Sequence, residues 1–248
     1  MYQRSRIIEK IRENENVYTL KFKTDINVNP GQFAMVWIPG VDEIPLSFSY
    51  VDDVKGFTFR IVGNGTRALG NLNVDDYIYF RGPYGTWYTD EGKSALFMAG
   101  GTGIASIAPF IEKSRAGEKY AVLGGKSIKE LFFIERIKNS VNNITVYTED
   151  GSFGEMGIVT DGLLKYSYDV IYACGPEKMI KSIMKKSSTR VQASLERIMK
   201  CGIGICDSCS INGYRVCRDG PVFKHEDLIK MEDLGKYSRT LSGKQVMM

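Results

Sequence analysis

Four cysteines near the end of the chain have a spacing that could hold a metal cluster. Cys201, Cys206, Cys209 and Cys217 form the pattern C-x4-C-x2-C-x7-C. Its first two intervals are those of plant-type [2Fe–2S] proteins, in which cysteine thiolates hold the irons. Two glycines between the first two cysteines would let the backbone come close to the sulfurs. The spacing therefore predicts a [2Fe–2S] cluster, which exchanges one electron at a time.

Two other interpretations of these cysteines stay open. Structural zinc usually takes evenly paired cysteines, whereas this pattern is asymmetric and rich in glycine. A disulfide framework needs an oxidising compartment, and residues 1–16 are too charged to contain the apolar part of a secretory signal. A fifth cysteine, Cys174, follows an apolar strand; it could be a plain buried thiol, although ligands bind at the carboxyl ends of parallel strands.

Two glycine-rich loops could approach an anionic ligand. Residues 99–105 (AGGTGIA) follow an apolar run and open a helical segment, so free N–H groups and the helix dipole would face a pyrophosphate. The dinucleotide fingerprint is matched only loosely, because Ser106 replaces its last glycine. Residues 63–66 (GNGT) follow a strand that carries Arg60. Arg60 could neutralise a phosphate or form an ordinary surface ion pair.

The elements that would position these loops change in kind along the chain. The first part consists of short alternating strands separated by turns, which predicts an antiparallel barrel or sandwich. Within it, residues 44–50 are expected to form an edge strand with a proline at its start. Later, buried strands alternate with helical segments at 130–138 and 177–185, which predicts a parallel sheet. We expect three domains, over residues 1–92, 93–190 and 191–248, the last ending in a tail.

Composition excludes several functions. The 248 residues contain a single histidine, His225, so catalysis by a histidine pair is not expected. The net charge of +4 is too small, and too evenly spread, for a nucleic-acid-binding protein. Residues 94–111 carry no charge and are as long as a minimal membrane span. Their glycines and Pro109 instead predict a strand, a turn and a buried helix, and we expect a cytoplasmic protein without a membrane segment.

Together these segments resemble the ferredoxin-reductase superfamily and, more narrowly, the electron-transfer subunits of NAD-dependent dihydroorotate dehydrogenases of the B type. The resemblance runs nearly from end to end. Its flavin-domain motifs are residues 30–33, 45–47, 63–66 and 82–85. Its nucleotide-domain motifs are residues 100–103, 150–152 and 174–176. Its cluster-domain motifs, the most specific ones, are residues 194–206 and 217–223.

This resemblance implies a flavin-binding β-barrel, a Rossmann-like nucleotide domain and a small C-terminal [2Fe–2S] domain. It also assigns residues to the cofactors FAD, NAD and the cluster. FAD would contact Pro45, Leu46 and Ser47 at its ring, and Arg60, Gly65 and Thr66 at its ribityl–phosphate end. NAD would contact Gly101, Thr102 and Gly103, with Cys174 and Gly175 near the nicotinamide. The cluster would be held by Cys201, Cys206, Cys209 and Cys217.

The chain departs from the family in two places. The seven-residue gap before Cys217 is shorter than in many relatives, so we expect a tighter cluster loop and a more exposed cluster. The other departure lies in a flavin motif. Relatives usually have an arginine before the proline of the 45–47 motif, and Ile44 stands here. Arginine can neutralise a pyrophosphate through two hydrogen bonds, which isoleucine cannot do. We hypothesise that Arg60 or Arg67 takes over this role. The substitution also leaves open a weaker hold on FAD.

The family's activity is an electron relay in pyrimidine biosynthesis. By resemblance, electrons would leave dihydroorotate at FMN in a separate catalytic subunit, cross the cluster and FAD, and reduce NAD⁺, in a complex with two copies of each subunit. No side chain is assigned a catalytic role, because the cofactors carry the reaction. Alternatives are a relay for a hydrogenase, a glutamate-synthase-like enzyme or ferredoxin, and a zinc-stabilised binding module without redox function.

The choice between NAD and NADP depends on two short segments. Glu149 and Asp150 follow a buried strand, where a carboxylate disfavours the 2′-phosphate of NADP. Lys126 and Ser127 could instead bind that phosphate. The carboxylates favour NAD.

Overall fold

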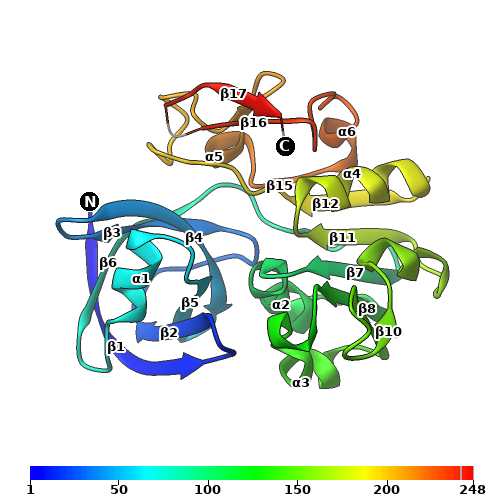
Figure 1. Cartoon of the computed structure of the whole chain (residues 1–248), viewed down its shortest axis with the longest axis horizontal. Coiled ribbons are helices and arrows are strands. Elements are labelled where there is room, and N and C mark those ends of the chain that lie inside the picture. Colours follow the sequence, from blue (N-terminus) through cyan, green and yellow to red (C-terminus); the bar gives the residue numbers. More distant parts are fainter. Residues whose placement is uncertain (241, 248) are drawn as a thin grey trace.

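The computed structural model describes residues 1–240 and 242–247. A barrel, a parallel sheet and a smaller third module occupy three corners of the molecule (Figure 1). The barrel and the sheet lie side by side, and the third module lies above both of them (Figure 1). None of the helices in the described part of the chain has the length and apolar character that crossing a membrane requires.

The barrel consists of six antiparallel strands in the closed order β1-β2-β5-β4-β3-β6. Apolar side chains such as Leu20, Phe22 and Phe57 point inward and fill it, because successive residues of a strand face opposite sides. A short helix, α1 (Asn64–Gly70), lies outside β4. The strands are β1 (Gln3–Arg12), β2 (Val17–Lys23), β3 (Phe33–Ile38), β4 (Asp42–Val51), β5 (Val54–Arg60) and β6 (Tyr77–Tyr84).

The prediction that residues 44–50 form an edge strand holds for only part of β4. Residues 42–47 pair with β3 alone, whereas Phe48, Tyr50 and Val51 pair with β5. The strand therefore passes from one neighbour to the other, and the barrel closes through the pairing of β1 with β6. Closure depends on contacts between distant segments, and a local alternation of residues does not reveal it.

The second domain contains a seven-stranded sheet in the order β10-β9-β8-β7-β11-β12-β15. All its pairings are parallel except that of β15. Residues 94–111 form the predicted strand, turn and buried helix, β7 and α2. The elements are β7 (Ser94–Gly100), α2 (Gly103–Lys113), β8 (Glu118–Gly125), β9 (Asn143–Thr148), β10 (Glu155–Met156), η3 (Val159–Leu164), β11 (Val170–Cys174), α4 (Glu177–Lys186) and β12 (Arg190–Ser194).

The single helix predicted over residues 130–138 is wrong, whereas the predicted helix over 177–185 corresponds to α4. Three short turns replace the first one: η1 (Ile128–Glu130), α3 (Ile134–Ile137) and η2 (Lys138–Ser140). Phe133 interrupts them because its backbone is left-handed, with a φ of 63°. A bulky residue in that conformation ends a helix. The apolar side chains of this segment pack in the core without forming one face of a regular helix.

The third module has little regular structure of its own. It contains β13 (Ser210–Ile211), β14 (Tyr214–Arg215), α5 (Val216–Asp219), β15 (Val222–Phe223), α6 (His225–Leu228), β16 (Tyr237–Arg239) and β17 (Gln245–Met247). The described part of the expected tail forms the β16–β17 hairpin. β15 extends the sheet of the second domain by pairing with β12, which itself begins at residue 190. The expected boundary after residue 190 stays a prediction.

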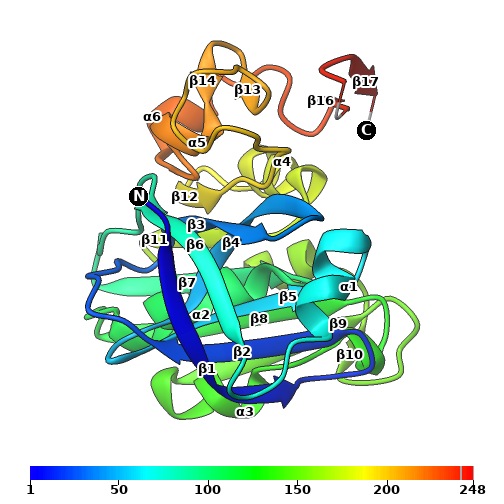
Figure 2. The same cartoon turned by 90° about the vertical axis from the view of Figure 1, so that its left-hand side faces the viewer.

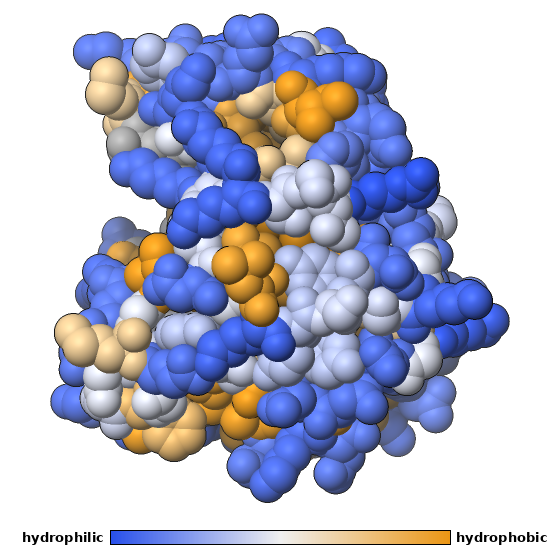
Figure 3. Space-filling model, turned by 90° about the vertical axis from the view of Figure 1, so that its right-hand side faces the viewer, coloured by the Kyte–Doolittle hydropathy of each residue, from blue (hydrophilic) through white to orange (hydrophobic). Residues whose placement is uncertain are grey.

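One apolar core joins the three parts. It includes Met35 from the barrel, Met98 from the sheet, and Cys209 and Cys217 from the third module. A view from the barrel side shows the third module resting on β3, β4 and β12 (Figure 2). The opposite face is mainly hydrophilic, with small, separate hydrophobic patches (Figure 3). The relative positions of the three parts are therefore fixed by shared packing rather than left to linkers.

Candidate cofactor sites

The four cysteines of the 201–217 segment lie close together in two pairs. Cys201 is in side-chain contact with Cys206, and Cys209 with Cys217. Cys206 is exposed, Cys201 is half-buried, and the other two are buried. A [2Fe–2S] cluster needs this arrangement, since each of its two irons takes two thiolates. Among the described residues, no three His, Cys, Asp or Glu side chains converge as the ligands of a single metal ion.

Backbone N–H groups of the same loop point at the sulfurs. Gly204 N lies 3.1 Å from Cys217 Sγ, and Ile205 N lies 3.3 Å from Cys201 Sγ. Gly202 and Gly204 are left-handed, with φ of 72° and 80°, and a Cβ on Gly204 would collide with Arg218. The loop thus curls around the sulfurs in a form that needs glycine, and its N–H groups favour negatively charged sulfur.

These contacts change the acidity of the thiols. Burial raises the pKa of Cys201, but N–H groups of Cys206, Ile203 and Ile205 outweigh it and lower the pKa to about 6. Burial, followed by contact with Cys209, raises the pKa of Cys217 to about 12. Cys201 is thus readily a thiolate, the form that binds iron. The donor set, its pairing and its N–H groups fit a [2Fe–2S] cluster.

The two flavin motifs of the barrel lie side by side. Pro45, Leu46 and Ser47 are half-buried in β4. A Cβ on Gly65 would lie 3.4 Å from Ile44, which precedes Pro45, so the start of α1 packs on this strand. Thr66 holds the start of α1, because its hydroxyl accepts hydrogen bonds from the N–H groups of residues 62 and 63. Residues 45–47, paired with β3 alone, thus lie beside the start of α1 where the family resemblance expects FAD.

Arg60 lies at the boundary between the barrel and the nucleotide domain. Its Nη1 is 2.8 Å from Glu130 Oε1, and Glu130 also accepts a hydrogen bond from Lys126 N. Arg60 Nη2 lies 4.0 Å from the position of a Cβ on Gly101. Arg60 therefore forms an ion pair, which was one of its two predicted roles. It also borders the glycine loop of residues 99–105. Arg67 is exposed on α1, so its substitution for the missing arginine stays a hypothesis.

The nucleotide motifs meet at the carboxyl ends of two neighbouring strands. β7 and β11 pair in register, with Ala99 opposite Cys174. A Cβ on Gly103 would lie 2.2 Å from the carbonyl oxygen of Cys174, and one on Gly175 would lie 3.0 Å from Gly100 N. The two loops thus touch through their backbones. Thr102 is the N-cap of α2. Ala105 N donates to the carbonyl oxygen of Thr102, which leaves the N–H groups of Gly103 and Ile104 for an anion.

Cys174 is buried, and its burial raises its pKa to about 12. Ser106, Ser194, Tyr88 and Glu196 surround it. Glu196 is an exposed residue, and desolvation by the neighbouring protein raises its pKa. Cys174 is therefore a neutral thiol, not a nucleophile. Glu196 stands within the 194–206 motif, but no local pattern marks it as a neighbour of Cys174.

Another group missed by sequence reasoning connects the barrel to the cysteine loop. Arg81 Nη1 donates a hydrogen bond of 2.7 Å to the carbonyl oxygen of Cys201. Its Nε and Nη2 bind both carboxylate oxygens of Glu43 at 2.7 Å each. In the sequence, only the position of Arg81 directly before the 82–85 motif could have pointed to this contact.

A closed antiparallel barrel followed by a parallel sheet with a glycine loop defines the fold of the ferredoxin reductases, here with an added cysteine-rich module. A solved NADH-dependent reduced ferredoxin-NADP oxidoreductase superposes with a TM-score of 0.79 at 26% identity, covering 92% of each chain. Ferredoxin-NADP⁺ reductase from Plasmodium falciparum has the same fold, with a TM-score of 0.62 at 18% identity, over 79% of this chain and 96% of that one.

Two further comparisons identify the family. The model "Iron-sulfur cluster binding domain of dihydroorotate dehydrogenase B" matches residues 196–229. Proteins named "Probable dihydroorotate dehydrogenase B (NAD(+)), electron transfer subunit" are 42% identical in Thermoplasma volcanium, over 97% of this chain and 96% of the relative, and 40% identical in Methanocaldococcus jannaschii, over 97% and 96%. The chain belongs to the family of dihydroorotate dehydrogenase B electron transfer subunits.

Proposed function

We propose that this chain is the redox relay of an NAD-linked dihydroorotate dehydrogenase, with FAD, a [2Fe–2S] cluster and NAD as its cofactors. When bound, the flavin can exchange electron pairs with the nicotinamide and single electrons with the cluster. The observation that carries the proposal is the order of the three sites. Residues 45–47 lie between the paired cysteines and the Gly101 loop. Met35 and Arg81 connect this strand to the cysteine loop, and Arg60 connects the barrel to the Gly101 loop.

The residues of the chain bind and position these groups. Pro45, Leu46 and Ser47 would lie against the flavin ring, while Arg60, Gly65 and Thr66 would hold its ribityl–phosphate end. Gly101, Thr102 and Gly103 would receive the pyrophosphate of NAD on the first turn of α2, with Cys174 and Gly175 beside the nicotinamide. The four paired cysteines would hold the iron.

The partner would be a catalytic subunit that oxidises dihydroorotate at FMN, in a cytoplasmic complex with two copies of each subunit. The relatives' name, an electron transfer subunit, supports a separate catalytic partner. We propose that the partner docks over the exposed side of the cysteine loop. Ile203 is 45% exposed and Ile205 is 76% exposed there, beside exposed Cys206. Apolar side chains next to a redox site suit a partner that must approach closely.

One reconstitution tests the relay. The chain is purified without oxygen, its flavin, iron, sulfide and zinc are measured, and dihydroorotate-dependent NAD⁺ reduction is assayed with the co-expressed FMN subunit. FAD with two irons and two sulfides per chain, and NADH formation, support the proposal. Zinc in place of iron, or ferredoxin reduction without any dihydroorotate activity, overturns it.

The docking face is tested separately. Ile205→Glu should prevent co-purification with the FMN subunit while leaving iron and flavin contents unchanged. Leu164→Glu is the matched control, because Leu164 is 95% exposed on the nucleotide domain, away from the cysteine loop. Equal co-purification of both variants would remove the loop from the interface.

A further inference from the structure

Three strands of the barrel connect the proposed flavin site to the cysteine loop in one row of residues. Met35 in β3 stands opposite Pro45 in β4 and opposite Arg81 in β6. Residues directly opposite each other in antiparallel strands have their side chains on the same face of the sheet. The row Pro45–Met35–Arg81 therefore lies on one face, and Pro45 is a proposed flavin contact.

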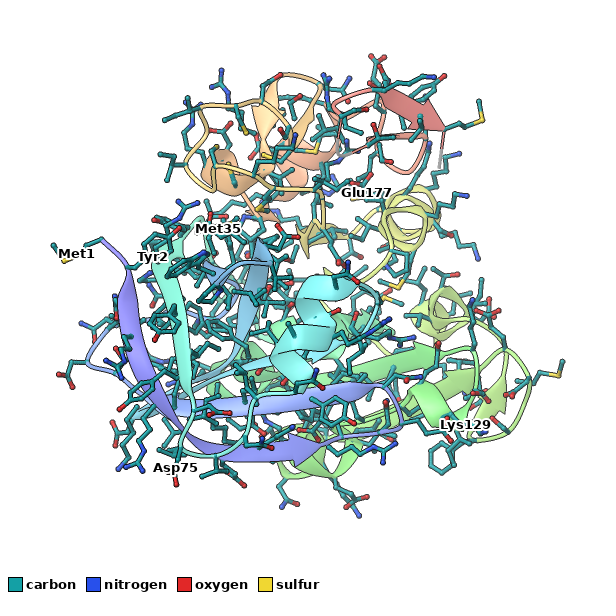
Figure 4. All side chains as sticks on the ribbon, turned by 60° about the vertical axis from the view of Figure 1, so that its left-hand side comes forward. Met1, Tyr2, Met35, Asp75, Lys129 and Glu177 are labelled. Carbon is teal, nitrogen blue, oxygen red and sulfur yellow. The ribbon has the colours of Figure 1, made fainter. Side chains whose placement is uncertain are left out.

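That face belongs to the core shared with the third module rather than to the inside of the barrel. Met35 is fully buried and packs in the same cluster as Cys209 and Cys217. In Figure 4, Met35 lies at the end of the barrel that faces the third module, and Tyr2 lies nearby. Asp75 lies at the opposite end of the barrel in the same view. The row thus leads from β4 directly to the cysteine loop.

Arg81 is the polar contact at the end of this row. Its hydrogen bond to the carbonyl oxygen of Cys201 is 2.7 Å long, and its other two nitrogens are held by Glu43. Tyr2 donates a further hydrogen bond of 2.7 Å to Glu43. The guanidinium is largely buried, with 17% of its side chain exposed. Because Glu43 fixes its orientation, Arg81 presents one N–H group to the loop at a fixed position.

The loop lies directly on Met35 beside that hydrogen bond. A Cβ on Gly202 would lie 2.6 Å from Met35 Cγ and 3.6 Å from Arg81 Nη1. Gly202 also has a φ of 72°, which side chains rarely allow. Residues 201 and 202 are thus seated on the barrel by one hydrogen bond and one close packing contact.

We propose that Arg81, oriented by Glu43, is a positioning residue that seats the first cluster ligand, Cys201, on the flavin-bearing strands and so fixes the contact between cluster and flavin. This inference rests on the proposed function and adds the residue that couples its two redox sites. Transfer between two sites requires aligned, closely spaced partners, so a shift of Cys201 away from the flavin-bearing strands slows it.

The test uses the holoprotein reduced by NADH in a rapid-mixing experiment. Arg81→Met should slow reduction of the cluster about tenfold or more, while flavin reduction by NADH stays unchanged. Arg81→Lys should restore only part of the rate, because a lysine can donate the hydrogen bond to Cys201 but cannot be oriented by both oxygens of Glu43. Arg6→Met is the matched control, since Arg6 forms an exposed ion pair with Asp75 on the same barrel.

A second measurement does not depend on activity. Amide hydrogen exchange of residues 202–206 in the cluster-loaded protein should speed up about tenfold or more in Arg81→Met, as expected for the loss of a charged hydrogen bond. Exchange in residues 209–217 should stay unchanged. Unchanged cluster reduction together with unchanged exchange would overturn the role of Arg81. A wild-type protein without flavin or cluster would instead overturn the proposed function, so the two failures are distinguishable.

Discussion

The cysteine loop and the Gly101 loop both curl around a proposed ligand with the help of glycine, but they are built differently. In the cysteine loop the ligating atoms belong to side chains close together in sequence, and glycine only lets the backbone follow them. In the Gly101 loop the binding groups are backbone N–H groups, and the loop is completed by residues 174–175 of another strand. Ligand binding at the cysteine loop should therefore be lost when side-chain atoms are removed. Ligand binding at the Gly101 loop should be weakened when side-chain atoms are added.

The largest effect is expected from removing a buried ligand. Cys209→Ser should abolish iron binding, because a serine hydroxyl is a poor substitute for a thiolate at a buried position. Iron and sulfide analysis of the purified variant measures this. Cys174→Ser is the control. Cys174 is also buried but belongs to neither cysteine pair, so the iron content of this variant should match that of the wild type. Equal iron loss in both variants would contradict the assignment.

The next effect concerns the contact that holds the third module on the nucleotide domain. Arg197 binds Glu177 through two hydrogen bonds of 2.7 and 2.9 Å, with 6% and 2% of these side chains exposed. Glu177→Ala should lower the free energy of unfolding by about 3–5 kcal/mol, because it leaves a buried charge unpaired. Arg6→Ala breaks an exposed pair with Asp75 and should cost less than about 1 kcal/mol. Denaturant unfolding compares them, and similar losses would count against the buried pair as an anchor.

A smaller effect tests the backbone character of the nucleotide loop. Gly103→Ala places a methyl group 2.2 Å from the carbonyl oxygen of Cys174. The two strand ends must move apart, which should cost about 1–3 kcal/mol and raise the apparent Kd for NAD. Gly117→Ala is the control, since the nearest atom to its Cβ is 3.6 Å away. Thermal unfolding measures the stability and titration with NAD measures the Kd. Equal values in both variants would contradict close packing of the two loops.

The smallest effect concerns the Glu43–Arg81 pair beneath the cysteine loop. Hydrogen bonding from Arg81 lowers the pKa of Glu43 below its ordinary value of 4.5, and Tyr2 adds to this. A lowered carboxyl pKa stabilises the fold above about pH 4.5, and this contribution is lost as the pH falls further. Glu43→Gln should therefore cost about 1 kcal/mol or less at pH 7, with the difference shrinking toward pH 3. Unfolding curves at both pH values check the trend; a difference that grows on acidification would contradict it.

Local patterns predicted much of the architecture. Strands are predicted at 17–23 and 33–38, and both are present with those bounds. The uncharged segment 94–111 became β7 and the buried α2, as its glycines indicated. The patterns failed where distant partners decide the outcome. β4 gains a second neighbour, β5, from Phe48 onward because the barrel closes, and residues 130–138 are no single helix because the backbone of Phe133 is left-handed.

The same division applies to the sites. The cysteine spacing alone predicted the cluster, because four ligands close together in sequence must meet in space. Neither Arg81 nor Glu196 has a local pattern that marks it, since Arg81 contacts Cys201 and Glu196 lies near Cys174, both far away in sequence. The roles of Arg60 and Arg67 toward FAD stay predictions.

The sequence by itself determined which chemistry this protein can carry: thiolates at cluster spacing, and glycine loops placed after apolar strands. Only the tertiary structure decided how these groups are coupled, by seating Cys201 on Arg81 and Met35 and by joining two strand ends at Gly103. The physical reason is that ligand identity depends on side-chain chemistry and short spacing. Distances between sites depend instead on packing between segments that the chain brings together from afar.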